Sequence, residues 1–427
     1  MFPSSGRVAE VAGTAAGTGG LLLVGLVSGA DLLTVTVDAL SVHLAFFDGT
    51  LSVVAFTAFV LATGTYVLWG VWADGGVERA TDGPPVCAVV PAYRDADVVD
   101  ICVESLLDSD YDPVEVAVVV EPDDPRTRRR AAAIAADHDA VSCLPNGNPG
   151  SKAGAINHAV ERSDVDFFAV FDADERVAPR FLPAAMGELL DGADVFQGRR
   201  VPRPTGVVES LAYCERVVVQ AGYAAAEPFG FTHCQSSSTA FTRAAVAAVG
   251  GYDDRLTEDI DFSHKCHSAG LTVRRRRDVA NTMEAPHSLR DLWGQRKRWR
   301  IGHVEVVEAR LRETAAAGVD AEDLLSVGRA TGAVAAGAFL LVCFAQVLFL
   351  LLQGVEWAVA VPYASVLGVV GGVWLRDHTR GRVGRPGVGL LLSPLVYLGH
   401  GVLTVTALLE YCLTWDGEWY QVTKVGA

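Results

Sequence analysis

Lysine is scarce in this chain of 427 residues: of 35 basic residues, only Lys152, Lys265, Lys297 and Lys424 are lysine. The basic residues are outnumbered by 51 acidic ones, so the formal net charge at pH 7 is −16. Nucleic acids are bound mainly through Lys and Arg contacts to phosphates. The lack of positive charge therefore excludes nucleic-acid binding as a function carried by the charge of the whole chain.

The eight cysteines lack the spacing of a metal site or of a disulfide framework, since none of them forms a C-x-x-C pair. We expect them to be small apolar residues in a reducing compartment. Apolar residues, by contrast, make up 50% of the chain, and the mean hydropathy is +0.28. This composition excludes a disordered chain and is unusual for an ordinary soluble enzyme.

The apolar residues gather in long runs, two near the N-terminus and three near the C-terminus. The runs span residues 11–30, 51–72, 327–352, 357–375 and 388–412. Each is about as long as the ~20 residues that cross a membrane as a helix. Buried helices of a soluble protein are the alternative, but five such runs exceed what one core needs. The first run has a second alternative, a signal peptide cleaved near Ala30.

The distribution of arginine orients these runs. Residues 31–49 contain no Lys or Arg, whereas residues 376–385 contain four Arg, and Arg7 precedes the first run. By the positive-inside rule, the N-terminus, the central region and residues 376–385 are cytoplasmic. The connector 353–356 and the C-terminus are then expected on the opposite side.

The chain therefore divides into three parts. Residues 1–82 are expected to be an N-terminal membrane region with two transmembrane helices. Residues 83–320 are expected to be a cytoplasmic domain that ends in an interfacial helix. Residues 321–427 are expected to hold about three transmembrane helices and a short tail. The protein is predicted to be a multi-pass protein of the cell membrane.

The central region begins with the pattern of an α/β fold. Residues 86–90 and 114–120 are continuous apolar runs, typical of strands buried on both faces, and residues 97–107 between them have helical spacing. A strand, a helix and a strand in this order predict a parallel sheet. Ligands bind beyond the carboxyl ends of such strands. Residues 91–94 and 121–124 lie at those ends.

A third apolar stretch, residues 167–171, is followed directly by Asp172 and Asp174. Two carboxylates at the end of a strand can share a divalent cation with diphosphate oxygens, because Mg²⁺ and Mn²⁺ prefer oxygen ligands. A solvated turn is the alternative.

Two further motifs follow along the chain. Glu258 and Asp259 begin a stretch with helical spacing, where acidic residues also stabilise a helix start. Gln295, Arg298 and Trp299 lie on a basic helix that could instead contact anionic lipid. Asp259 and Gln295 are separated by 35 residues.

The combination D-x35-QxxRW, preceded by DxD and a strand–helix–strand opening, resembles the membrane-embedded family 2 glycosyltransferases. That family includes the cellulose, chitin, hyaluronan and poly-N-acetylglucosamine synthases. The resemblance covers residues 84–302. It implies a GT-A-like α/β domain between transmembrane α-helices, and inverting transfer from a nucleotide sugar, expected to be a UDP-sugar, with Mg²⁺ or Mn²⁺. It also implies a glycan or lipid-linked acceptor and contact with membrane lipids.

The resemblance assigns the donor site residue by residue. Pro91 and Tyr93 match the first-strand motif that lies against the nucleotide base. The family has an acidic turn that holds the base and ribose. The matching turn of this chain, residues 121–124, departs from the family pattern, so Glu121, Asp123 and Asp124 all remain candidates for that role. Other matches near the donor are Lys152, Asn157 and the metal-binding residues Asp172 and Asp174.

The remaining matches concern the acceptor. Asp259 matches the general base, which takes the proton from the attacking hydroxyl. Four residues match the motifs that hold the acceptor end and the pyrophosphate, namely Glu258, Gln295, Arg298 and Trp299. Residues 231–238 lie where relatives have an acceptor loop, but Gln235 replaces a glycine there.

Residues 419–424 resemble the gating-loop sequence of cellulose synthases, with an aromatic residue, Val422, Thr423 and Lys424. This resemblance conflicts with the predicted topology. Either residues 388–412 re-enter the membrane, with Pro394 breaking the run, or the match is accidental. The predicted topology is preferred.

Two functions are open: extension of a glycan, with or without export, and transfer of one sugar to a lipid or lipid-linked acceptor. A transporter is disfavoured because the carboxylates lie in the central region, outside the apolar runs.

Overall fold

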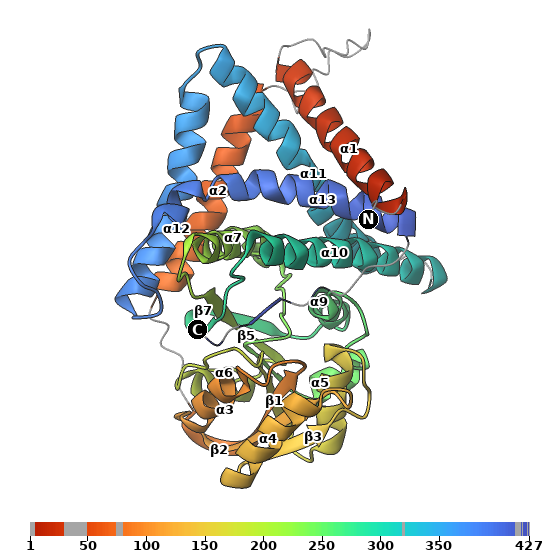
Figure 1. The fold of residues 1–427 in the computed structure, drawn as a ribbon, viewed down its shortest axis with the longest axis vertical. Coiled ribbons are helices and arrows are strands. Elements are labelled where there is room, and N and C mark those ends of the chain that lie inside the picture. The colour runs from red at the N-terminus through yellow and green to blue at the C-terminus, as the bar shows by residue number, and fades with distance from the viewer. Residues whose placement is uncertain are drawn as a thin grey trace.

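The computed structural model describes residues 5–29, 49–73, 80–317, 321–414, 420, 422–424 and 426. An α/β domain lies below, and long apolar helices rise above it (Figure 1). Three predictions fall outside the described residues: the cleavage position at Ala30, the connector up to residue 48, and residues Trp419 and Gln421 of the tail.

The described residues form one seven-stranded sheet with the strand order β3-β2-β1-β4-β6-β5-β7. The strands from β3 to β4 are parallel, β6 is antiparallel to both of its neighbours, and β5 is parallel to β7. The strands are β1 (Asp82–Ala92), β2 (Asp112–Val120), β3 (Val141–Pro145), β4 (Phe167–Val170), β5 (Val195–Pro202), β6 (Thr239–Thr242) and β7 (Val273–Met283).

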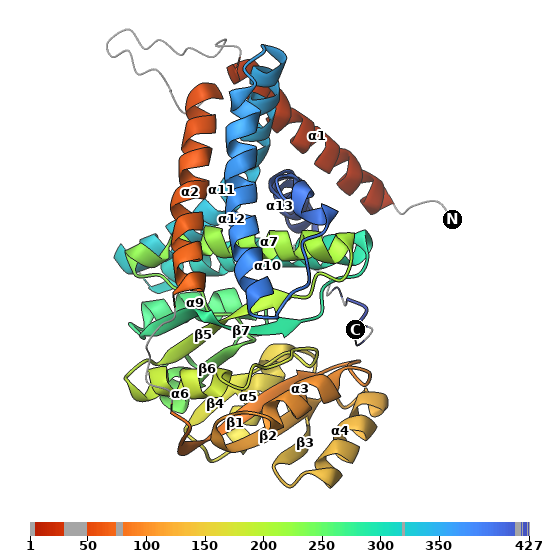
Figure 2. The same cartoon turned by 90° about the vertical axis from the view of Figure 1, so that its left-hand side faces the viewer.

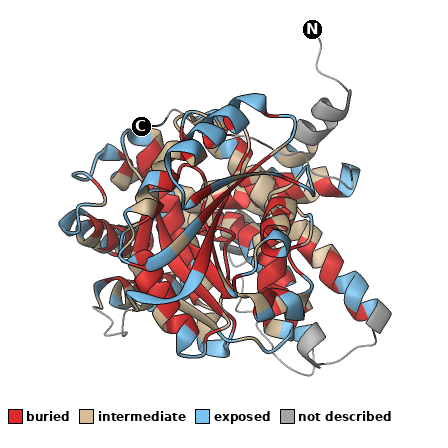
Figure 3. Cartoon of the chain, turned by 90° about the horizontal axis from the view of Figure 1, so that it is seen from below, coloured by how far each residue is buried: buried red, intermediate tan, exposed pale blue. Residues whose placement is uncertain are grey.

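Helices cover both faces of this sheet. They are α3 (Val99–Leu107), α4 (Pro125–Asp137), α5 (Lys152–Arg162), α6 (Phe181–Leu190), α8 (Arg243–Val249) and α9 (Glu258–Ser268). Val86, Ala88 and Val90 of β1 pack toward α3 and α6, whereas Cys87 and Val89 pack toward α5 and α9. Because both faces of β1 are buried, its sequence is apolar without alternation. Figure 3 shows the strands as the buried centre of the domain.

Three long helices form a layer between the sheet and the upright helices (Figures 1 and 2). They are α7 (Val207–Ala224), α10 (Leu289–Ala317) and α13 (Leu395–Thr414). We call them the transverse layer. Two short turns of 3-10 helix complete the described elements of the chain, η2 (Glu227–Phe229) and η3 (Val388–Leu392).

The upright helices are α1 (Ser5–Gly29), α2 (Gly49–Trp72), α11 (Ala321–Leu352) and α12 (Trp357–Thr379). Among the described residues, four helices are long and apolar enough to cross a membrane: α2, α11 from Leu324 on, α12 and α13. The apolar part of α1 is shorter, Gly13–Leu26. The prediction of an α/β domain inserted between apolar helices is confirmed.

The apolar run at residues 388–412 is divided at Pro394, one of the alternatives that the sequence leaves open. This run is not one upright helix, because η3 ends before Pro394 and α13 then lies across the molecule. Proline cannot continue the hydrogen-bond ladder of a helix. On α13, Glu410 pairs with Lys297 of α10 at 2.6 Å and His400 accepts a hydrogen bond from Arg300. These polar contacts hold α13 along α10 rather than upright.

The arginine-rich linker lies against the α/β domain, as expected. The Arg382 guanidinium donates to the carbonyl of Asp278 on β7 at 2.9 Å. Asp377, at the end of α12, pairs with Arg199 of β5 and accepts from Tyr213 of α7 at 2.7 Å. A charged network therefore joins α12 to the sheet and to the transverse layer.

Candidate active site

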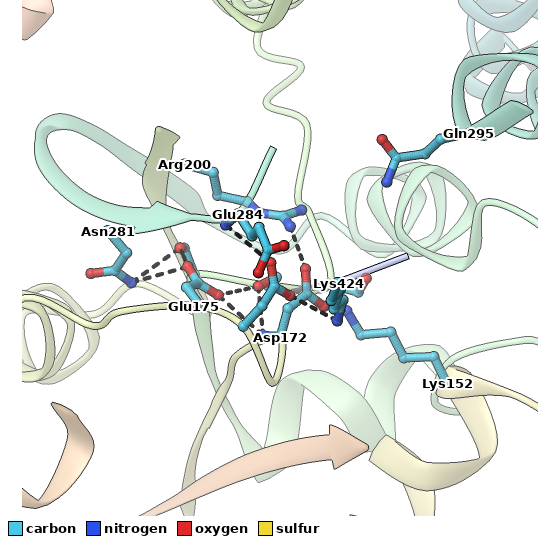
Figure 4. Close-up of polar contacts among 12 residues, drawn as sticks. Lys152, Asp172, Glu175, Arg200, Asn281, Glu284, Gln295 and Lys424 are labelled. Atoms are coloured by element: carbon cyan, nitrogen blue, oxygen red, sulfur yellow. Dashed lines mark hydrogen bonds and ion pairs between the residues drawn. The ribbon is translucent and has the colours of Figure 1, made fainter. Parts of the chain in front are cut away.

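An acidic centre lies at the carboxyl ends of β1 and β4, where the sheet order predicts a ligand (Figure 4). Asp172 follows β4, and its two carboxylate oxygens bind Lys152 of α5 and Arg200 of β5. Burial alone would raise the pKa of Asp172, but Lys152 and Arg200 lower it well below its usual range. Asp172 is therefore an anion held between two cations.

Asp174 is 3% exposed and is bound from two directions. One of its oxygens lies 2.8 Å from the ammonium of Lys424, and the other accepts from the backbone N–H of Glu284 at 3.1 Å. The Lys424 ammonium also lies 2.9 Å from Asp95. Burial works against this ammonium, but Asp174 and Asp95 raise its pKa above the usual value.

Glu175 supports the turn that carries both aspartates. It is fully buried, binds the hydroxyls of Ser237 and Ser238, and accepts from the Asn281 amide at 3.2 Å. It also accepts from the backbone N–H of Asp172 at 3.1 Å. Burial raises the pKa of Glu175 to about 7.

Asp259 lies in the first turn of α9. Burial and the neighbouring Glu258 raise its pKa to about 6, against the opposing effect of Lys152 and Arg200. Its carboxylate accepts from the backbone N–H of Ile260 at 2.9 Å, and Glu258 accepts from Ser236 at 2.7 Å. Lys152 and Arg200 thus act electrostatically on both Asp172 and Asp259, which connects the two carboxylates.

The QxxRW residues lie on α10, in the transverse layer. Arg298 donates to the carbonyl of Leu256 at 2.8 Å, and its charge acts on Glu258 and Asp259. The Gln295 side chain accepts a hydrogen bond from Arg296 and lies apart from the acidic centre in Figure 4. The last residue of the motif, Trp299, has the guanidinium of Arg296 4.1 Å from its ring centroid.

The acidic turn after β2 has partners within the chain. Asp124 caps α4 by accepting from the Thr127 N–H at 3.1 Å, and it accepts from the Arg94 N–H at 2.5 Å. Glu121 binds residues 146–150, through the Asn146 amide at 2.6 Å and the Gly150 N–H at 2.9 Å. Asp123 is exposed.

The other expected donor residues differ in their placement. Pro91 and Tyr93 are half-buried at the end of β1, and the Tyr93 N–H donates to Asp95 at 3.1 Å. Asn157 binds both backbone groups of Tyr252, at 2.8 and 2.9 Å. Its amide therefore fixes a loop, and the structure does not bring it to the acidic centre.

The sequence analysis missed several residues of this centre. They are Asp95, Glu175, Arg200, Ser237, Ser238, Asn281 and Glu284. Arg200 had a usable signal, because a charged residue inside the buried strand β5 needs a partner. Glu175 follows the DxD directly, but the other residues come from loops and from strand β7, far apart in the sequence.

The C-terminal tail also lies at the centre, which overturns the predicted topology of the C-terminus. Besides the contacts of Lys424, the Tyr420 hydroxyl donates to Asp291 at 2.9 Å, and the Gly426 N–H donates to Glu284 at 3.0 Å. The tail therefore reaches the same end of the molecule as the α/β domain. The preference for the topology over the gating-loop resemblance was wrong.

Among the described residues, no group of three or more His, Cys, Asp or Glu side chains is arranged as a metal site. The chemistry of the centre nevertheless suits a hard cation, since Asp95 and Asp174 already share one positive charge on Lys424. Carboxylate oxygens are the ligands that Mg²⁺ and Mn²⁺ prefer. Asp174 can therefore hold a divalent cation in place of the ammonium, whereas Asp172, two residues earlier, already binds Lys152 and Arg200.

Residues 84–302 match the family described as glycosyltransferase like family 2. This match covers just over half of the chain, and the chain belongs to glycosyltransferase family 2. Its family 2 domain is the α/β domain described above, and apolar helices flank it on both sides in the sequence.

The chain is similar to two curated bacterial proteins. It is 24% identical over 243 residues to the probable glycosyltransferase YdaM of Bacillus subtilis, covering 54% of this chain and 58% of that protein. It is 25% identical over 228 residues to poly-beta-1,6-N-acetyl-D-glucosamine synthase of Staphylococcus aureus, covering 51% and 54%. The chain thus matches just over half the length of these relatives.

Solved structures also resemble the chain. The mannosyltransferase PcManGT from Pyrobaculum calidifontis, in complex with GDP-Man and Mn²⁺, is 16% identical with a TM-score of 0.49, over 86% of this chain and 99% of that one. Residues 1–349 of TarS from S. aureus are 13% identical with a TM-score of 0.39, over 80% and 95%.

Proposed function

We propose that the protein is an inverting glycosyltransferase that transfers a sugar from a nucleotide sugar, expected to be a UDP-sugar, to a growing polysaccharide or glycan. The observation that carries this proposal is the position of Asp259. Its carboxylate has a pKa of about 6 and shares the electrostatic effect of Lys152 and Arg200 with Asp172. The charges of Lys152 and Arg200 thus act both on a carboxylate of raised pKa and on the acidic centre.

The proposed reaction exchanges one bond at the anomeric carbon. The acceptor hydroxyl loses its proton to Asp259 while its oxygen attacks the anomeric carbon. The bond from that carbon to the donor's phosphate oxygen breaks, and the nucleoside diphosphate leaves with the electron pair. Lys152 and Arg200 would stabilise the charge that develops on the leaving group.

We assign the remaining residues around these two groups. A divalent cation, Mg²⁺ or Mn²⁺, would be held by Asp172 and Asp174 and would supply further positive charge for the diphosphate. Glu258, Gln295, Arg298 and Trp299 would position the acceptor end and the pyrophosphate. The base and ribose would lie near the remaining donor residues, which are Pro91, Tyr93, Glu121, Asp123 and Asp124, whereas Asn157 would support the site only by fixing the loop at Tyr252.

The proposed location is the cell membrane, with the α/β domain in the cytoplasm. The arginine-rich linker supports it by the positive-inside rule, since Arg382 lies against that domain. The division into residues 1–82, 83–320 and 321–427 is proposed with it.

The test is a transfer assay with the full chain in lipid nanodiscs and a panel of radiolabelled UDP- and GDP-sugars. We expect one donor to label a glycan whose length a gel reveals, and Asp174→Ala to abolish that labelling. Lack of transfer from every donor, or equal labelling by the Asp174→Ala variant, would overturn the proposal.

A further inference from the structure

Two arginines in the transverse layer, one buried and one half-buried, have no carboxylate partner among the described residues. Arg216 of α7 is 4% exposed, its guanidinium lies 4.8 Å from the ring centroid of Trp299, and its Nε atom is buried without a hydrogen-bond partner among the described residues. Arg300 of α10 is half-buried and donates to the Nδ1 atom of His400 at 2.6 Å. Because that nitrogen accepts the bond, His400 does not neutralise Arg300.

The nearby charges do not balance these two cations. Glu215 pairs with Arg296 at 2.7 Å and lies 3.5 Å from His400. Among the described side chains it is the one carboxylate whose charge acts on Arg216, Arg296 and Arg300 together. Burial, with the charges of Arg200 and Arg296, lowers the pKa of Arg216 to about 10. The transverse layer therefore holds a surplus of positive charge on buried and half-buried side chains.

A surplus of positive charge of this kind favours the binding of an anion beside these arginines. A charge taken out of water without a partner is costly, so buried charges are normally paired. The planar guanidinium matches the geometry of a phosphate with two parallel N–H donors. Trp299 adds a flat apolar surface beside the guanidinium of Arg216.

The position of the surplus charge indicates where the anion comes from. α7, α10 and α13 lie directly beneath the upright apolar helices (Figure 2). Tyr223 of α7 links this site to the candidate base: burial raises the pKa of its phenol to about 12, and the charges of Asp259, Arg300 and Arg216 all act on it. The site thus lies between the membrane helices and Asp259, whereas Asp124 and Asp172 lie at the sheet.

We propose that Arg216 and Arg300, beside Trp299, bind the phosphate group of an acceptor that is carried on a membrane lipid. This inference rests on the proposed function and names the acceptor of the same site. A phosphate on a hydrocarbon chain suits a site with apolar helices above and a base below. Inorganic phosphate offers the same chemistry without the chain, and the experiment separates the two.

The experiment uses the full chain in nanodiscs and three probes: farnesyl phosphate, farnesol and inorganic phosphate. We expect farnesyl phosphate to bind, as measured by protection of the chain against thermal unfolding, and farnesol not to bind. Arg216→Gln should weaken that binding by on the order of 10- to 100-fold, as expected for the loss of a charged hydrogen-bonding group. Binding of the nucleoside diphosphate should stay unchanged.

Control variants separate binding from folding. Arg312→Gln changes an exposed arginine of the same helix as Arg300, which pairs with Glu308, and the variant should bind farnesyl phosphate as the parent does. Arg296→Met should lower the melting temperature because it leaves Glu215 unpaired, whereas Arg216→Met should not lower it.

The possible outcomes are distinct. Equal binding of farnesol and farnesyl phosphate, or of inorganic phosphate and farnesyl phosphate, would overturn the lipid-phosphate site. Loss of nucleoside diphosphate affinity in Arg216→Gln would assign the arginine to the donor instead. Transfer to a glycan with no binding of farnesyl phosphate would refute this inference alone, whereas absence of transfer from every donor refutes the proposed function.

Discussion

A general base must be ionised at the working pH and still attract a proton, and the neighbours of Asp259 give it both properties. Burial and Glu258 make the carboxylate more basic, while Lys152 and Arg200 keep it from becoming neutral at pH 7. The balance of these effects places the pKa at about 6. General bases work best when their pKa lies near the operating pH.

Asp259→Asn keeps the shape of this side chain and removes its basicity. We expect the transfer rate to fall on the order of 10²- to 10⁴-fold, the usual contribution of general acid–base catalysis. Donor affinity should survive, because Lys152 and Asp172 are untouched. Turnover and nucleoside diphosphate affinity, measured on the same preparation, check both statements. If turnover stays within a few-fold of the parent, Asp259 only supports the helix start.

The pH dependence of turnover tests the same residue in another way. Asp259 must be ionised to accept the proton, so the rate should fall as the pH drops through about 6. Glu258 raises the pKa of Asp259, so Glu258→Gln should move this acidic limb to lower pH. The pH profile of kcat for the parent and the variant gives the comparison. An unchanged limb would mean that another group controls it.

At the scale of single residues, the sequence predicts those site residues that belong to a short continuous motif. Asp172, Asp174, Asp259 and Arg298 were named before the structure, because each motif lies within one short segment. Arg200 was not, since its partner Asp172 is brought to it only by the packing of β5 against β6 and of β6 against β4. Single motifs do not contain this information.

Among the secondary-structure elements, apolar pattern predicted the strands better than it predicted helix direction. Residues 86–90 were expected to be buried on both faces, and alternate residues of β1 do pack into different cores. The same kind of run at 388–412 was expected to cross the membrane. Hydropathy could not show that α13 lies across the molecule, because Lys297 and Arg300 on α10 decide its direction.

The tail offers a test at this scale. The Lys424 ammonium lies 2.8 Å from the Asp174 carboxylate, where a divalent cation would also bind, and two cations on one carboxylate repel each other. Lys424→Met should therefore strengthen binding of Mn²⁺ on the order of 10-fold, since a like-charge contact in a partly screened site is worth about 1–4 kcal/mol. Electron paramagnetic resonance of bound Mn²⁺ measures this directly, without an activity assay.

Lys265→Met is the matched control for the tail. Lys265 pairs with Asp253 at 3.1 Å and makes no contact with the acidic centre, so its variant should bind Mn²⁺ as the parent does. Weaker Mn²⁺ binding in Lys424→Met would show that the tail helps to hold the cation rather than competing with it.

For the whole molecule, the structure fixes which ends lie together. The N-terminal end of α1 lies at the level of the transverse layer, and both views place the tail beside the α/β domain (Figures 1 and 2). The turn between α11 and α12 lies at the opposite end. Sequence patterns predict the number of apolar runs. If all five runs were upright helices, the C-terminus would lie at the end of the molecule opposite the α/β domain.

Cysteine labelling in intact cells tests this arrangement, in a background where the exposed Cys412 is replaced by serine. We expect a membrane-impermeant maleimide to label Gln353→Cys, because the turn after α11 is distant from the α/β domain. Arg380→Cys and Val422→Cys should be labelled only after permeabilisation, because the linker and the tail both contact that domain. Labelling of Val422→Cys alone would contradict the folded-back tail. If Arg380→Cys and Val422→Cys were both labelled and Gln353→Cys were protected, the linker and the tail would still lie on one side of the membrane. That side, with the α/β domain, would then be outside the cytoplasm.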